Sequence, residues 1–267
     1  MAIILLLIAI VVGALGALLG IGGGVLLIPL LTGILGIPIK TAIGASLISV
    51  IATSTAAGAV YSGRGLTHTK LGILLAIGTT LGALTGGITA SIVSPQVLQI
   101  LFAALLVFVA YSMRQLPADE AAGHPTGVLD TVYFDPISGR WIRYGVRRLP
   151  LGWLSAFVAG NLSGLLGVGG GIINVPVMSL LMGVPLKATI ATSNFMIGMT
   201  AATSAIVYYS RQMLDPQIVV PTALGVLIGA QLGSRLGSRV RSVVLKRIFQ
   251  VLLFVFAVQM IWKAIGL

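Results

Sequence analysis

The sequence contains two glycine clusters whose backbone N–H groups are expected to bind a ligand. Residues 18–24 read LLGIGGG and residues 165–171 read LLGVGGG, each after a long apolar run. Glycines at the start of a helix expose backbone N–H groups, and the positive end of the helix dipole favours an anion there. We expect two anion-binding sites at the starts of short helices and call them the first and the second mouth. The first is formed by Gly22, Gly23 and Gly24, and the second by Gly169, Gly170 and Gly171. The alternative is close helix packing, which needs one glycine per turn; three in a row favour a broken helix.

Several neutral polar side chains lie close to these clusters in the sequence. Ser46, Ser193 and Asn194 stand near the start of the next apolar segments, where they could donate hydrogen bonds to the oxygens of an anion. Asn174 and Gln231 are the amides placed deepest in apolar surroundings. For the serines the alternative is a hydrogen bond to a carbonyl of their own helix.

Charged groups are scarce and lie at the edges of apolar runs. Lys40 and Lys187 could attract anions at two openings, or mark the membrane interface by snorkelling. All acidic residues fall in expected loops: Asp119, Glu120, Asp130, Asp135 and Asp215. No apolar segment therefore carries a negative charge that would repel an anion. Cysteine is absent and both histidines, His68 and His124, fall in loops, so we expect no metal site, no cofactor and no enzyme.

Composition places the chain in a membrane. Of 267 residues, 57% are hydrophobic and only 8% are charged, with a mean hydropathy of +1.11. A water-soluble domain carries about a quarter charged residues. The net charge of +11 does not indicate nucleic acid, because the basic residues flank apolar runs as they do in membrane proteins.

The two clusters belong to an internal duplication. Residues 16–115 and 163–262 align without a gap when Gly20 is placed on Gly167. Residues that match in register include Pro29 with Pro176, Pro38 with Pro185, Lys40 with Lys187, Ser46 with Ser193, Tyr61 with Tyr208, Arg64 with Arg211 and Gly82 with Gly229. Apolar composition alone would not align Pro, Lys, Tyr and Arg.

Each half is expected to contain a helical hairpin and three membrane spans. The first half has a long run at 2–19, a short run at 25–36 and spans at 41–61, 71–92 and 97–113; the second has 151–166, 172–183, 188–209, 217–237 and 245–265. Twelve helical residues rise only about 18 Å, so the second arm of each hairpin stops short of crossing the bilayer. We also expect Gly82, Gly86, Gly229 and Gly233 to serve helix packing.

The charges of the loops predict how the two halves are oriented in the membrane. The loop before the span 71–92 carries Arg64 and Lys70 in the first half, whereas in the second half the basic residues follow the matching span 217–237, within 235–247. Under the positive-inside rule the halves therefore form an inverted-topology repeat, as in secondary transporters. Both termini are then outside, and the linker is cytoplasmic. A parallel duplication with irregular loop charge is the alternative.

A polar linker separates the halves. The expected divisions are membrane repeat 1 (1–113), a cytoplasmic linker (114–150) and membrane repeat 2 (151–267). Within the linker, β-branched and aromatic residues flank an Asp-Pro-x-Ser-Gly turn, which predicts a small β-hairpin. The fold class is thus an all-α polytopic membrane protein with two inverted repeats and one hairpin.

The motifs GIGGGVLLIPLL and GVGGGIINVPVM, each followed by Gly-x-Pro-x-Lys, resemble those of the sulfite exporter TauE/SafE family of membrane transporters. The resemblance covers nearly the whole chain. It implies transport of small sulfur anions such as sulfite, thiosulfate, sulfoacetate or other organosulfonates across the cell membrane. An anion channel and a structural partner subunit are the alternatives, and the coupling ion and a homodimer stay open.

Overall fold

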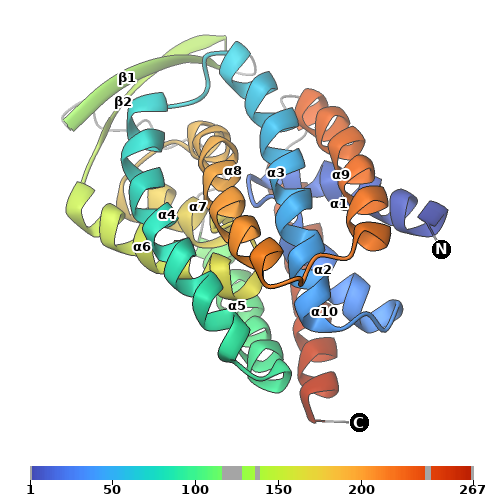
Figure 1. Ribbon diagram of the computed structural model, residues 1–267. Helices are drawn as coiled ribbons and strands as arrows, with labels where there is room; N and C mark the ends of the chain where they lie inside the picture. The colour runs from blue at the N-terminus through green and yellow to red at the C-terminus, as the bar shows by residue number, and fades with distance from the viewer. Residues whose placement is uncertain (1, 116–127, 136–138, 238–241, 266–267) are drawn as a thin grey trace.

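The computed structural model describes residues 2–115, 128–135, 139–237 and 242–265, and it is a body of helices with one β-hairpin at its edge (Figure 1). The first half contains α1 (Ala2–Leu19), α2 (Gly24–Pro29), η1 (Leu30–Ile34), α3 (Ile39–Gly63), α4 (Thr69–Ile92) and α5 (Pro95–Gln115). The second contains α6 (Leu149–Leu166), α7 (Gly171–Pro176), η2 (Val177–Leu181), α8 (Leu186–Ser210), α9 (Pro216–Gly237) and α10 (Ser242–Ile265). In the described part of the chain, 7 helices are long and apolar enough to cross a membrane. The all-α polytopic membrane fold is confirmed.

The same order of elements occurs twice, and the central helices of the two halves run in opposite directions. The N–H of His68, just after α3, donates to Thr192 Oγ1 near the start of α8 (2.9 Å). At the other end, a β-carbon placed on Gly44 near the start of α3 would lie 2.7 Å from the carbonyl oxygen of Met213, just after α8. Figure 1 shows the same relation in the opposite colour gradients of α3 and α8. How the halves lie relative to a membrane stays a prediction.

The halves interlock through glycine-lined crossings between long helices. α1 packs along α9 and α6 packs along α4, so each first helix contacts a helix of the other half. The glycines of α9 that face the backbone of Leu6, Ile10 and Ala14 are Gly225, Gly229 and Gly233. Those of α4 that face Trp153, Phe157 and Asn161 are Gly78, Gly82 and Gly86. A spacing of four residues keeps the glycines on one face, and the predicted packing role of Gly82, Gly86, Gly229 and Gly233 is confirmed.

The short helices change geometry at their prolines. Pro29 and Pro176 end α2 and α7, and a π-helical turn of 5 residues follows each of them, η1 and η2. Proline has no N–H to donate to the carbonyl four residues earlier, so the helix widens at that point. In the first half, Thr32 Oγ1 donates to the carbonyl of Ile28 (2.9 Å) and so satisfies one backbone group. The continuous helix Gly24–Ile34 rises about 16 Å, roughly half of a bilayer core.

The linker contains the predicted β-hairpin. β1 (Val128–Asp135) pairs antiparallel with β2 (Arg140–Val146), with Tyr133 opposite Ile142. Tyr133 and Tyr144 are buried in one apolar cluster with Met182, at the end of η2. Burial raises the pKa of the Tyr144 hydroxyl above its ordinary value, so this group stays neutral. Asp119, Glu120 and His124 of the linker lie outside the described residues.

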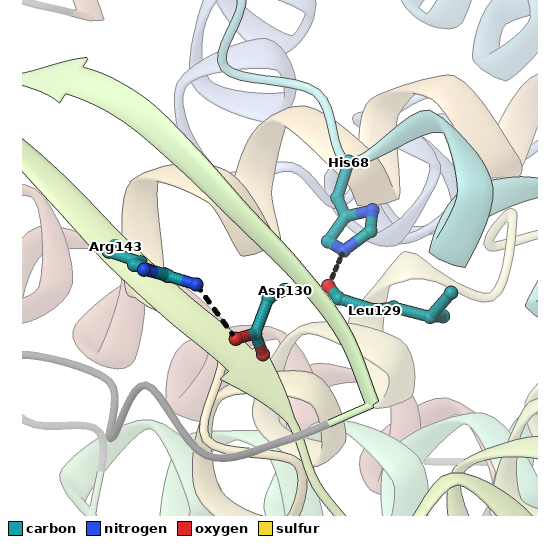
Figure 2. A network of polar contacts seen from close by, with 4 residues as sticks. All are labelled: His68, Leu129, Asp130 and Arg143. Carbon is teal, nitrogen blue, oxygen red and sulfur yellow. Dashed lines mark hydrogen bonds and ion pairs between the residues drawn. The ribbon is translucent and has the colours of Figure 1, made fainter.

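His68 joins the hairpin to the helices (Figure 2). Its ring is buried, its Nδ1 accepts the N–H of Leu71 at the start of α4 (3.3 Å), and its Nε2 lies 2.9 Å from the carbonyl oxygen of Leu129 in β1. These partners assign the proton to Nε2, so the ring caps α4 as a neutral acceptor. The nearby Arg143–Asp130 ion pair (3.5 Å) is largely exposed and contributes little to stability. The hairpin is therefore anchored by His68 and by the buried tyrosines.

Candidate anion-binding site

The two glycine clusters lie against each other at the centre of the molecule. A β-carbon placed on Gly24 would lie 2.7 Å from the carbonyl oxygen of Gly167, and one placed on Gly171 would lie 2.5 Å from that of Gly20. A β-carbon placed on Gly22 or on Gly169 would lie within 3.4 Å of both Val50 and Ile197. Those two residues stand near the middle of α3 and α8, which have 25 residues each. The structure thus brings the two predicted mouths together, halfway along the longest helices.

The clusters interrupt the helix, as the run of three glycines predicts. The backbone is left-handed at Gly22 (φ 81°), Gly23 (φ 73°), Gly169 (φ 80°) and Gly170 (φ 76°). Residues with a β-carbon adopt this conformation rarely and at a cost. The chain leaves the first helix of each half before the three glycines and starts the short helix at the last of them. The glycines are needed for this change of direction.

Backbone donors are concentrated where the short helices begin. Within the described residues, the N–H groups of Gly23, Gly24, Gly170 and Gly171 have no hydrogen-bond acceptor. The first N–H groups of a helix have no partner inside the helix. Because α2 and α7 both begin at the centre, the positive ends of their dipoles meet there. This arrangement favours a negative charge between them.

Ser46 and Ser193 tie each half to the glycine cluster of the other. Ser46 Oγ donates to the carbonyl of Gly167 (2.6 Å), and Ser193 Oγ donates to that of Gly20 (2.6 Å). Both side chains are fully buried. Their hydroxyl protons are therefore engaged by backbone carbonyls, and donation to an anion would require that they leave these partners. Their role as anion ligands stays a prediction.

The predicted amides fall into three situations. Asn194 Nδ2 donates to the carbonyls of Ala17 (3.2 Å) and Ile190 (3.0 Å), so its donors are engaged. Asn174 is buried, and its Nδ2 has no hydrogen-bond partner in the described part of the chain. Gln231 is exposed on α9, and its apolar surroundings stay a prediction. Asn174 is thus the amide with unengaged donors.

The lysines are placed away from the glycine clusters. Lys40 Nζ donates to the carbonyl of Ser91 in the last turn of α4 (3.1 Å). Lys40 lies in the first turn of α3, more than one helical turn before Ser46. A cation at the carboxyl end of a helix is favourable for the dipole of that helix, so this contact supports the structural role for Lys40. Lys187, at the matching position, is half-buried.

Two tyrosines fix the ends of the broken helices, a role that sequence reasoning missed. Tyr61 donates to the carbonyl of Ala17 in the last turn of α1 (3.1 Å), and Tyr208 donates to that of Leu165 at the end of α6 (3.4 Å). The last carbonyls of a helix need external donors. The signal was present, because the two tyrosines match in the duplication and a buried hydroxyl in an apolar span needs a partner.

No acidic side chain approaches this centre among the described residues. Asp130 and Asp135 lie in the hairpin, and Asp215 accepts the N–H of Gln217 (2.9 Å) at the start of α9. The described residues also hold no group of three or more metal-ligating side chains. The chemistry available at the centre is hydrogen-bond donation from neutral groups.

The chain is similar to known membrane transporters along most of its length. The profile of the family described as "Sulfite exporter TauE/SafE" matches residues 5–260. The probable membrane transporter protein YunE of Bacillus subtilis is 27% identical over 76% of this chain and 77% of its own length. The probable membrane transporter protein MJ0441 of Methanocaldococcus jannaschii is 30% identical over 77% of this chain and 71% of its own length.

A probable membrane transporter protein of Xylella fastidiosa is 26% identical over 92% of this chain and 90% of its own length. No solved structure matches the chain. The family match extends over both halves and the linker. The chain is therefore a multi-pass membrane transporter and belongs to the sulfite exporter TauE/SafE family.

Proposed function

We propose that this transporter is a secondary carrier that moves small sulfur-containing anions across the cytoplasmic membrane. Sulfite is the anion that the family description names, and thiosulfate, sulfoacetate and related organosulfonates are the further members of the proposed substrate class. The observation that carries the proposal is the meeting of two short-helix N-termini, with unengaged backbone N–H groups, halfway along α3 and α8. Broken helices whose N-termini face an anionic substrate group are a recurrent device of secondary carriers.

Alternating access is the mechanism that we propose. The antiparallel α3 and α8 and the crossed packing of α1 on α9 and α6 on α4 support two bundles that rock about a central site. A site held by neutral donors binds an anion without burying an opposite charge, so the anion can leave on either side. An anion channel and a partner subunit are the competing functions, and both lack this need for a binding site at the centre.

Flux into liposomes tests the proposal. We expect purified protein to take up radiolabelled thiosulfate or sulfite with saturable kinetics and with dependence on an imposed gradient. A panel of sulfur oxyanions and organosulfonates, with chloride as the comparison, ranks the substrates. Flux that does not saturate would indicate a channel, and no flux of any sulfur anion under any gradient would contradict the proposed function.

Orientation in the membrane is a separate prediction. The basic loops at 64–70, 140–148 and 235–247 are expected inside, because positive residues favour the cytoplasmic side. The chain has no cysteine of its own, so single cysteines report accessibility without background. An Arg140→Cys variant, at an exposed site of the hairpin, should react with an impermeant thiol reagent only after the cells are permeabilised.

The matched control for orientation is Ser94→Cys. Ser94 is exposed in the uncharged loop between α4 and α5, which the prediction places outside. It should react in intact cells. Reaction of the cysteine at position 140 in intact cells would overturn the predicted topology.

A further inference from the structure

The two mouths differ in their side chains although their backbones match. Three positions around the start of α7 carry residues of a different kind from those around α2: Ala159 replaces Val12, Ser163 replaces Gly16, and Asn174 replaces Leu27. Two of these changes add hydrogen-bond donors, and the third removes two methyl groups. Asn174 lies on the short helix, the carbonyl of Ala159 faces its start, and Ser163 follows Ala159 by one turn on α6, so the second mouth is the more polar and the less filled.

Contacts at the glycine before each short helix show the effect. A β-carbon placed on Gly23 would lie 3.3 Å from Cγ1 of Val12, so a valine methyl group occupies this space in the first half. The matching point on Gly170 lies 3.7 Å from Nδ2 of Asn174. The amide therefore reaches back to the beginning of its own helix, which is continuous as Gly171–Leu181. At the second mouth an N–H donor stands where the first mouth has an apolar group.

Ser163 adds a hydroxyl on the neighbouring helix. It lies one turn after Ala159 on α6, and the carbonyl oxygen of Ala159 would be 3.4 Å from a β-carbon on Gly170. In the first half, a β-carbon on Gly16 would collide with the backbone nitrogen of Gly23. The first mouth has no room for a side chain at this position, whereas the second accommodates serine.

Both added groups lack partners. Ser163 Oγ and Asn174 Nδ2 have no hydrogen-bond partner within the described residues, and the two side chains are 0% and 2% exposed. An unsatisfied buried polar group costs about 1–3 kcal/mol, and lipid offers it no compensation. Two such groups beside unengaged backbone donors are explained by a ligand that accepts hydrogen bonds.

We propose that the second mouth, at Ser163, Gly170, Gly171 and Asn174, is the primary subsite for one oxygen of the sulfur oxyanion. Asn174 and Ser163 donate side-chain hydrogen bonds that the first mouth cannot supply, and they favour an oxyanion, which accepts several directed bonds, over a halide. This inference rests on the proposed function and deepens it. The backbone of the two mouths is symmetric, but their side chains are not. The anion is therefore bound more tightly at the start of α7 than at the start of α2.

The test measures equilibrium binding of radiolabelled thiosulfate to purified protein. Asn174→Leu installs the residue of the first half, and Ser163→Ala removes only the hydroxyl. We expect each variant to bind thiosulfate about tenfold more weakly, or worse. The free energy of one hydrogen bond to a charged acceptor is larger than the free energy that corresponds to a tenfold change in Kd. Affinity for chloride should change less than affinity for thiosulfate.

The matched control is Ser49→Ala. Ser49 Oγ is also buried without a partner, but it lies on α3, where Met196 is the matching residue of the second half. This variant should bind within about twofold of the parent. If folded Asn174→Leu and Ser163→Ala proteins bind thiosulfate like the parent, or if Ser49→Ala weakens binding equally, the subsite is overturned and the proposed function stands. A parent protein that binds and moves no sulfur oxyanion overturns both.

Discussion

Replacing Ser193 by aspartate is expected to abolish binding and transport of sulfur anions. Ser193 is fully buried, and its hydroxyl donates to the carbonyl of Gly20 at the centre of the molecule. A carboxylate has no proton for that carbonyl, and an unpaired buried charge costs several kcal/mol. It would also repel the anion in a region of low dielectric. We expect the loss in affinity to be on the order of a hundredfold or more, with Ser46→Asp giving the same result by symmetry.

Two further variants of α8 separate charge from folding. Ser210→Asp introduces the same charge at the exposed end of the helix and should leave binding unchanged. Ser193→Ala removes the hydrogen bond without adding charge, and it should cost about 1–3 kcal/mol of stability because the Gly20 carbonyl loses its donor. Thermal unfolding and thiosulfate binding are measured on each. A folded Ser193→Asp protein that binds thiosulfate like its parent would place the anion elsewhere.

The broken helices were predictable from sequence because the constraints that make them are local. Glycine triplets, prolines at matching positions and a run too short to cross a bilayer each limit the backbone without reference to distant residues. The duplication then doubled every such signal. For this reason the helix breaks and the short length of the helices that follow them were predictable from the sequence pattern.

Hydrogen-bond partners were not predictable in the same way. Ser46 and Ser193 bond to carbonyls 121 and 173 residues away in the chain. The choice depends on how the halves dock, which periodicity does not specify. The serines were expected to donate to an anion, but the nearest acceptors proved to be the carbonyls of the opposite glycine cluster. Asn194 likewise bonds to Ala17 of the first half.

The exposure of Gln231 and His68 was not predictable from sequence for a different reason. In a membrane both faces of a helix are apolar, so the sequence of α9 does not show which face meets lipid. Gln231 lies on a face of α9 that the rest of the protein leaves exposed. His68 was assigned to a loop, which is correct, but the hairpin covers that loop and buries the ring. A loop position indicates exposure only when no other element packs on it.

Replacing Gly170 by leucine is expected to abolish anion binding with a limited loss of stability. Gly170 has a left-handed backbone (φ 76°), which costs a residue with a β-carbon roughly 1–2 kcal/mol. The new side chain would start 3.4 Å from the Ala159 carbonyl and 3.7 Å from the Asn174 amide, so it fills the mouth and shields the N–H groups. Thiosulfate binding and the unfolding temperature are measured on the same preparation.

Gly183→Leu supplies the matched comparison, because it imposes the same backbone strain without the same contacts. Gly183 is also left-handed (φ 70°), but a β-carbon there would meet nothing within 4 Å. Both variants should therefore lose a similar part of their stability, and only the change at position 170 should remove binding. If Gly170→Leu unfolds while Gly183→Leu stays folded and active, the glycines serve packing at the centre. If both fold and bind alike, the backbone donors of the second mouth do not contact the anion, since a leucine cannot fill that mouth and leave a ligand there undisturbed.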